Sequence, residues 1–595
     1  MAGKYRLTTL GCKVNQYESA QVRQLLESAG YLPARPGEHA DIAIVNTCAV
    51  TCSATAKSRQ ALRRLARRCD QTVAMGCFAQ ADPRAVSRIG GVTEVVGHDA
   101  DVLARIHRLI ADEGRGSPRV GADDRDDSAP VGDRSPDLVQ VGWRLAGGAC
   151  SPGGELPSRP LNTNYYSIGR PGPKVNRSAP APAGRSRDDR EEPGTAVWDN
   201  AGGPQRERAG GLEEGPHTCA RGSDVTSADG DADGCIPGGS GRSGLARLMA
   251  APGDTLTTSL RAFGGRTRAF LKIQDGCDAS CTYCIIPRLR STLRYKPIPV
   301  AVDEARALVR AGHKEIVLTG IFLGAYHRST AIRRRFGDDG SPLADLVDAL
   351  AGIEGLARLR LSSLEPGDMD DALLGVIARH SNCVPHFHLP LQSGSGHVLR
   401  RMNRQYSIDA YLAMIDRVRA VLDRPAITTD IIVGFAGESD GMFKETLDVA
   451  RSVGFCKIHA FPFSPRPGTA AWRWTDQFVH PQTVKDRMAT LATLDRQEAT
   501  AYAGQFIGTR QRVLVEGASA DHTRCNSGHR PPNRRQRAPD ERRAVSPSTV
   551  KKPAHGRTDR YFPVVFESDT VQPGDLVEVR IDRVTPTRVH GVLAG

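Results

Sequence analysis

The sequence AFLKIQDGCDASCTYC (residues 269–284) joins an apolar run to three closely spaced cysteines, Cys277, Cys281 and Cys284. The apolar run predicts a buried strand, and the cysteines then fall in the loop at its end. A cubane iron–sulfur cluster normally takes four thiolates, so three thiolates leave one iron open to another ligand. A structural zinc site needs a closed set of four ligands, and no fourth cysteine follows nearby. The spacing therefore favours an iron–sulfur cluster with an open iron over a zinc ribbon or inert buried thiols.

The region around this stretch repeats a strand–helix pattern from about residue 265 to residue 500. Helical stretches separate six strand-like runs, which lie at residues 269–274, 315–318, 357–361, 386–391, 428–433 and 457–463. Six such units predict a partial (β/α)6 barrel, smaller than the usual eight-fold form. Strand-end loops are where α/β barrels place their chemistry, and the three cysteines occupy such a loop.

The N-terminal residues predict a separate small domain. Strand-like runs at 6–10, 41–45 and 72–75 alternate with helical stretches at 19–29 and 56–68, which indicates a parallel α/β domain. A cysteine follows each strand within a few residues: Cys12, Cys48 and Cys77. Because the carboxyl ends of parallel strands lie along one edge, the three thiols are expected to converge there. On position alone, three small buried apolar side chains remain an alternative interpretation.

Two segments lack a sustained period. Residues 111–250 are rich in Gly, Pro, Ser, Arg and Asp, which predicts a disordered insertion that cannot bury enough apolar surface to offset its ordering entropy. A basic, Pro-rich stretch at about 519–555 interrupts a tail of short strand-like runs, which predicts a small β-barrel with an expanded loop. Those runs lie at 512–515, 562–566, 576–581 and 588–593. We therefore expect an α/β protein with a parallel α/β domain at 1–110, the barrel at 251–504 and the β-barrel at 505–595.

The net charge of +13 is concentrated in one place. Residues 521–557 carry ten Lys or Arg and three Asp or Glu, so this segment alone has a net charge of +7. The charge is compatible with RNA binding and does not establish it. The lack of a signal-like N-terminus and of an apolar run of about 20 residues predicts a cytoplasmic protein without a membrane partner. Fourteen cysteines in 595 residues favour metal binding in a reducing compartment over a disulfide scaffold.

Several motifs resemble a known family. Cys277, Cys281 and Cys284, with Tyr283 before the last cysteine, resemble the signature of radical S-adenosylmethionine (SAM) enzymes. The sequences TLGCKVNQYES (9–19), NTC (46–48) and GCFAQ (76–80) resemble the N-terminal domain of methylthiotransferases, which are radical SAM proteins. The resemblance continues in LSSLEP (361–366), HFHLPLQSG (386–394) and MNR (402–404), and the tail resembles a TRAM module, an RNA-binding β-barrel.

The resemblance implies two [4Fe–4S] clusters. Cys277, Cys281 and Cys284 would hold one whose open iron binds SAM and whose electron generates a 5′-deoxyadenosyl radical. Cys12, Cys48 and Cys77 would hold an auxiliary cluster that carries the sulfur to be methylated by a first SAM and delivered to the substrate. Tyr283, Glu365 and Gln392 are candidates for binding SAM, although Glu365 and Gln392 are equally suited to supporting the barrel rim. His386 and His388 are expected to be core histidines with satisfied hydrogen bonds.

The sequence around Cys12 most resembles the subgroup that acts on N6-threonylcarbamoyladenosine next to the tRNA anticodon. The implied partners are a tRNA anticodon stem–loop and an unidentified electron donor, and we expect a monomer. N6-isopentenyladenosine in tRNA and an aspartate of a ribosomal protein are alternative substrates. A hypothesis of a different class is an RNA-binding iron–sulfur protein whose insertions have abolished turnover.

Overall fold

The computed structural model describes residues 3–98, 102–113, 256–335, 340–518 and 552–594. The insertion predicted at 111–250 lies outside these residues, except that positions 111–113 end the helix α5 (Val102–Glu113). The basic segment predicted at about 519–555 also lies mostly outside them. Its last residues, however, belong to strand β15 (Lys552–Thr558), so the prediction placed the end of this segment too late.

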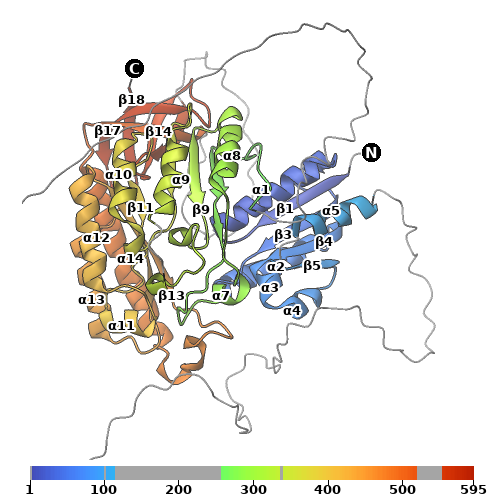
Figure 1. Cartoon of the computed structure of the whole chain (residues 1–595), viewed down its shortest axis with the longest axis horizontal. Coiled ribbons are helices and arrows are strands. Elements are labelled where there is room, and N and C mark those ends of the chain that lie inside the picture. The colour runs from blue at the N-terminus through green and yellow to red at the C-terminus, as the bar shows by residue number, and fades with distance from the viewer. Residues whose placement is uncertain (1–2, 99–101, 114–255, 336–339, 519–551, 595) are drawn as a thin grey trace, which may run out of the picture. The chain divides into compact units, whose positions relative to one another are not determined.

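The N-terminal part is a five-stranded parallel sheet with the order β2-β1-β3-β4-β5 (Figure 1). The strands are β1 (Lys4–Thr9), β2 (Leu32–Pro33), β3 (Ala40–Thr47), β4 (Cys69–Gly76) and β5 (Glu94–Val96). The helices are α1 (Lys13–Ser28), α2 (Cys52–Leu65), α3 (Cys77–Ala81), α4 (Pro83–Ser87) and α5. Apolar residues of α1 and α5 share a core with one face of β3 and β4, and those of α2 share a core with the other face. The predicted parallel α/β domain is confirmed.

Helix α1 begins six residues earlier than predicted, at Lys13 instead of Ser19. Its first turns are polar, so hydrophobic periodicity does not reveal them. They are helical because their side chains are buried against the ends of the strands: Asn15 and Glu18 are 0% and 3% exposed. The earlier start places Lys13 and Glu18 on a rigid element directly after Cys12.

The central part contains the six predicted strands as two parallel three-stranded sheets, with the orders β10-β9-β6 and β11-β12-β13. Isolated bridges between Leu359 and Cys383 and between Ser363 and His388 join the sheets, as a partial barrel requires. The strands are β6 (Arg268–Lys272), β9 (Glu315–Thr319), β10 (Arg358–Leu361), β11 (His386–His388), β12 (Ala426–Val433) and β13 (Lys457–Pro462). The short elements β7 (Gln274–Asp275), α7 (Ile286–Leu289) and β8 (Arg294–Tyr295) follow β6.

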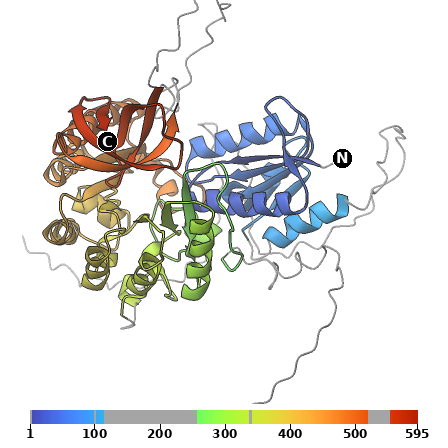
Figure 2. The ribbon, with the colours of Figure 1, turned by 90° about the horizontal axis from the view of Figure 1, so that it is seen from above.

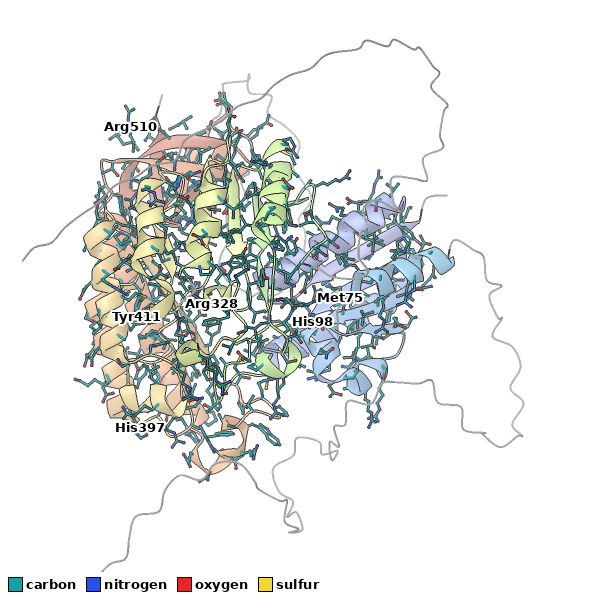
Figure 3. All side chains as sticks on the ribbon, viewed as in Figure 1. Met75, His98, Arg328, His397, Tyr411 and Arg510 are labelled. Carbon is teal, nitrogen blue, oxygen red and sulfur yellow. The ribbon has the colours of Figure 1, made fainter. Side chains whose placement is uncertain are left out.

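Helices cover the outer side of this barrel (Figure 1). They are α8 (Ile298–Arg310), α9 (Pro342–Ala351), α10 (Asp371–Arg379), α11 (Gly396–Arg401), α12 (Ile408–Val421), α13 (Asp440–Val453) and α14 (Pro481–Gly504). Their apolar faces share one core with the strands, and Tyr411 of α12 (Figure 3) donates a hydrogen bond to the carbonyl of Leu389 at 2.7 Å. Within the described residues, no helix has the length and apolar character needed to cross a membrane.

The C-terminal part is a closed five-stranded barrel with the order β14-β15-β16-β18-β17 (Figure 2). Its strands are β14 (Arg510–Ala518), β15, β16 (Pro563–Ser568), β17 (Leu576–Val584) and β18 (Val589–Leu593). The small β-barrel is therefore confirmed. Strand β15 was not predicted, because its sequence KPAHGRT contains Pro and Gly and lies next to the basic segment.

Candidate functional site

The three-cysteine loop, residues 277–284, lies between β7 and α7 and is held by its own backbone groups. The N–H of Cys277 donates to the carbonyl of Arg290 at 2.9 Å. The N–H of Thr282 donates to the carbonyl of Met402, at the end of α11, at 3.0 Å. The positions of the three cysteines are thus fixed by hydrogen bonds to two other segments.

The start and the centre of the loop are also constrained. Gly276 has a φ of +84°, and a Cβ at this position would lie 2.0 Å from the carbonyl oxygen of Thr292. Only glycine satisfies both conditions. The carboxylate of Asp278 accepts hydrogen bonds from the hydroxyl of Thr330 at 2.7 Å and from the N–H of Ala331 at 2.6 Å.

Arg404 places a positive charge beside the loop. Its Nη1 lies 3.1 Å from the Sγ of Cys281 and 3.4 Å from the hydroxyl of Tyr283, and its Nη2 forms an ion pair with Glu365. Two of the predicted SAM-binding residues, Tyr283 and Glu365, are therefore brought together at one guanidinium beside Cys281. Gln392 has a left-handed backbone (φ +61°), and its side chain makes no hydrogen bond to any described residue.

The pKa values of the three thiols in the loop are shifted upward. Burial raises the pKa of Cys277 and of Cys284 to about 12, and the neighbouring Cys281 adds to both shifts. Burial also raises the pKa of Cys281, while Arg404 acts in the opposite direction. Buried thiols of this kind ionise when a metal replaces the proton, so metal binding and deprotonation are coupled.

The strand-end trio, Cys12, Cys48 and Cys77, converges as predicted at one edge of the N-terminal sheet. Cys48 follows β3 and Cys77 follows β4 directly, and Cys12 comes three residues after β1, the other neighbour of β3. Burial raises the pKa of the Cys77 thiol to about 12, and Cys12 and Cys48 add to this shift. This mutual influence indicates that the three sulfurs lie near one another. Cys12 is exposed, whereas Cys48 and Cys77 are buried.

Two glycines allow the strand ends to approach so closely. Gly11 has a φ of +102°, and a Cβ there would lie 3.1 Å from the Sγ of Cys48. Gly76 has a φ of +94°, and a Cβ there would lie 2.3 Å from the Oδ1 of Asn46. A side chain at either position would push the cysteine-bearing ends apart.

Asn15 ties the same edge together. Its Nδ2 donates to the carbonyl of Leu10 at 2.9 Å and to that of Thr47 at 3.0 Å, and its own carbonyl accepts from the Nδ2 of Asn46 at 2.9 Å. These bonds link the segments that carry Cys12 and Cys48.

Both thiol sets fit a cubane cluster better than a single metal ion. Within the part of the chain that the structure describes, no three His, Cys, Asp or Glu side chains lie close enough to hold one metal ion. Each thiolate of a cubane binds a different iron, so its ligands stand further apart than those of one ion. Three convergent cysteines and a nearby cation match that donor set.

A buried ion network connects the N-terminal domain to the three-cysteine loop. Its members are Glu18, Lys272, Asp275 and Arg290, whose side chains are at most 5% exposed. Arg290 Nη1 donates to Glu18 at 2.8 Å and to Asp275 at 2.9 Å, and Lys272 Nζ donates to the same carboxylates at 2.9 Å and 2.7 Å. Burial alone would raise the pKa of both carboxyls, but Arg290 and Lys272 hold them well below their usual range.

His98 extends this network to the strand-end trio. Its Nε2 lies 3.3 Å from the Sγ of Cys77 and 3.1 Å from a nitrogen of Arg290. Burial and the charge of Arg290 lower the pKa of His98 to about 3, which keeps the imidazole neutral. Figure 3 shows His98 near Met75, whose strand pairs with β5. Arg290 thus contacts the three-cysteine loop through its carbonyl, and its side chain reaches His98, which lies beside Cys77.

The two barrel histidines differ from each other. His388 contacts the hydroxyl of Thr428 at 2.9 Å and Asp430 at 3.3 Å, as expected of a satisfied core histidine. His386 is 5% exposed, yet neither of its ring nitrogens has a hydrogen-bond partner among the described residues. For His386, the expectation of a satisfied core residue is therefore wrong.

Comparison with known proteins assigns the three parts separately. Residues 271–450 match the family model described as the Radical SAM superfamily. Residues 4–97 match the model described as uncharacterized protein family UPF0004, and residues 551–594 match the TRAM domain. The partial barrel and its three-cysteine loop thus form a radical SAM domain.

The named relatives indicate which kind of radical SAM protein this chain resembles. The chain is 38% identical over 271 residues to the threonylcarbamoyladenosine tRNA methylthiotransferase MtaB of Thermotoga maritima, covering 45% of this chain and 60% of the relative. It is 28% identical over 578 residues to MtaB of Bacillus subtilis, covering 96% and 92%. It is 39% identical over 328 residues to the tRNA-2-methylthio-N(6)-dimethylallyladenosine synthase of Frankia casuarinae, covering 53% and 58%. The chain is thus similar to radical SAM methylthiotransferases, and three of the curated relatives are named MtaB.

The alignments with the Thermotoga and Frankia relatives span about three fifths of the length of each relative. The Bacillus relative is matched over nearly its whole length, at lower identity.

Sequence reasoning missed several residues at the site. Arg404 was quoted only as part of the MNR motif, and its contact with Cys281 comes from the fold. His98 follows strand β5 as the cysteines follow their strands, but β5 was not among the predicted strands, so the strand-end argument did not reach it. Arg290 carried no local signal, because its partner Glu18 is 272 residues away.

Proposed function

We propose that this protein adds a methylthio group to C2 of N6-threonylcarbamoyladenosine next to the tRNA anticodon. The observation that carries the proposal is the pair of three-cysteine sets, each at strand ends, within a chain that also has a TRAM barrel. MtaB is the name of the first three curated relatives, which supports the choice of nucleoside.

The cysteines have the roles of cluster ligands in this proposal. Cys277, Cys281 and Cys284 would hold the cluster that binds SAM, and Cys12, Cys48 and Cys77 the auxiliary cluster. Such clusters, with SAM, supply one-electron chemistry at a C–H bond that no general base can open at neutral pH. The chain itself positions these groups.

The surrounding side chains have identifiable tasks. Arg404 holds a positive charge beside Cys281 and orients Glu365, which with Tyr283 and Gln392 we propose to contact SAM. The buried ion network fixes the N-terminal domain against the loop, so that the two cysteine sets keep one relative position. His98 directs its Nε2 towards Cys77.

The test is a reaction with defined RNA. The protein is reconstituted anaerobically with iron and sulfide, reduced, and incubated with SAM and an anticodon stem–loop that contains N6-threonylcarbamoyladenosine. Nucleoside mass spectrometry should detect its 2-methylthio derivative. Absence of this product from a reaction that still forms 5′-deoxyadenosine would refute the choice of substrate. Complementation of a deletion strain provides the same readout in cells.

A second candidate substrate is N6-isopentenyladenosine in tRNA. It is favoured by relatives named as dimethylallyladenosine synthases at 37–40% identity. The same assay with isopentenyladenosine RNA separates the two, and a ribosomal-protein peptide tests the aspartate alternative. A protein that binds RNA but forms no 5′-deoxyadenosine would instead match the RNA-binding hypothesis.

A further inference from the structure

We propose that the cavity beside Cys12 binds an anionic substituent of the substrate nucleoside, with the Lys13 ammonium and the His386 imidazole as the groups that contact it. The inference rests on the proposed function and adds to it the chemistry by which the enzyme would select its nucleoside.

The cavity has a volume of about 560 Å³, and residues from all three folded parts line it. The start of α1 supplies Cys12 and Lys13, the barrel strands supply most of the wall, and Tyr561 comes from the turn between β15 and β16. The space therefore opens next to a cysteine of the strand-end trio. A base that receives sulfur from this trio has to lie beside it.

Positive side chains outnumber negative ones in the lining. The cations are Lys13, Arg266, Arg268 and Arg360, and the acid is Asp430. In a partly enclosed cavity, where the dielectric is lower than in bulk water, such an excess attracts an anion more strongly than it would on a flat surface.

The arginines of the wall already have contacts. Arg360 Nε donates to Glu315 at 2.8 Å, and Arg268 forms an ion pair with Glu516 at 2.9 Å. The guanidinium of Arg266 lies 5.9 Å from the centre of the Phe270 ring. These contacts fix the arginines as part of the wall.

Lys13 is different. Its ammonium makes no hydrogen bond or ion pair with any residue that the structure describes, and the acid of the cavity, Asp430, is 3.3 Å from His388 instead. Lys13 also directly follows Cys12. A lysine side chain without an ion pair at this place favours a ligand that brings its own negative charge.

His386 provides the second group. Its ring is 4.6 Å from the ring of Tyr561, and both of its nitrogens lack partners among the described residues. Burial and the charges of Arg360 and Lys13 hold its pKa well below the usual value, so the ring is neutral and carries one N–H donor. A buried donor without a partner is costly, and a carboxylate oxygen would satisfy it.

These two groups discriminate between the candidate nucleosides. The threonylcarbamoyl group ends in a carboxylate and carries a hydroxyl, whereas the dimethylallyl group has neither. A site built to hydrogen-bond a substrate group rejects an analogue that lacks it, because its buried polar atoms are then left unpaired. The cavity therefore matches the carboxylate-bearing nucleoside.

The test compares two anticodon stem–loops that differ only at the threonylcarbamoyl carboxylate, which is free in one and a methyl ester in the other. Dissociation constants are measured for the reconstituted full chain. We expect the wild type to prefer the free acid by about 10- to 100-fold, as for a charged hydrogen bond. The Lys13→Met variant should bring the ratio of the two constants close to one, and Lys13→Arg should restore most of it.

Two further variants keep the result interpretable. Lys57→Met removes an exposed charge from α2 and should leave the ratio unchanged, whatever its effect on RNA binding in general. His386→Phe retains the aromatic contact with Tyr561, is distant in sequence from the six cysteines of the two sets, and should reduce the ratio even if Lys13→Met loses its cluster. An equal affinity of the wild type for both RNAs would overturn the inference, as would a ratio that survives both Lys13→Met and His386→Phe.

The outcome is separable from that of the proposed function. If the wild type forms the methylthio product on the free acid but binds the ester equally well, the inference fails and the function stands. If it modifies only dimethylallyl RNA, the proposed nucleoside is wrong.

Discussion

Replacing Glu18 by Gln removes one charge from the buried ion network without changing the shape of the side chain. In the wild type, two carboxylates face two cations whose side chains are 0% and 2% exposed. In the variant, Asp275 alone has to compensate Lys272, Arg290 and the partly exposed Arg294, whose Nη2 lies 3.4 Å from it. Breaking a buried ion pair by removing one partner costs about 3–5 kcal/mol, because a buried charge is left uncompensated. We expect a loss of stability in this range.

The measurement is urea unfolding of the cluster-free protein, followed by circular dichroism, with the free energy taken from the shift in midpoint at constant slope. Glu445→Gln, on the exposed surface of α13, is the matched control and should change stability by less than about 0.5 kcal/mol. The double variant Glu18→Gln, Lys272→Met restores the charge balance and should lose less than the sum of the single variants. A loss below about 1 kcal/mol for Glu18→Gln would refute the reasoning.

Two other expectations follow from the barrel and its loop. Burial would raise the pKa of Glu315, but Arg360, Arg268 and Arg358 lower it to about 2. The ionised carboxylate therefore stabilises the fold at a pH above the pKa of Glu315 in the unfolded chain. This stabilisation is lost as the pH falls towards 2. The shift in pKa corresponds to roughly 3 kcal/mol of stability. The difference in unfolding free energy between wild type and Glu315→Gln should therefore shrink between about pH 6 and pH 3. A difference that stays constant over this range would contradict the prediction. Gly276→Ala should displace the three-cysteine loop from Thr292 and lower the reconstituted iron content to about half, since only one cluster is affected. Unchanged iron would show that the loop tolerates a side chain there.

Much of the fold was predictable because its signals are local. Each of the six barrel strands is an apolar run between helical stretches, and the observed β9, Glu315–Thr319, differs from its prediction by one residue. Strand β15 and the first turns of α1 were missed because they lack such a local apolar signal. Both are polar or broken by Pro and Gly, and both are fixed by contacts with distant segments.

The candidate site was predictable only where position in the chain determines position in space. Cys12, Cys48 and Cys77 follow adjacent parallel strands, so their convergence follows from topology. No such rule predicts the positions of the side chains that lie between the cysteine sets. Glu18 meets Lys272 across 254 residues of sequence, a contact that no spacing indicates.

The most direct measurement of the central claim uses two triple variants. In one, Cys12, Cys48 and Cys77 become Ala, and in the other Cys277, Cys281 and Cys284 become Ala. After reconstitution, the wild type should hold roughly eight iron atoms and each variant roughly four. Mass spectrometry should detect 2-methylthio-N6-threonylcarbamoyladenosine only with the wild type, and 5′-deoxyadenosine should disappear only with the second variant. Methylthio product from the first variant, or a wild type with a single cluster's iron, would contradict the assignment of two cooperating cluster sites.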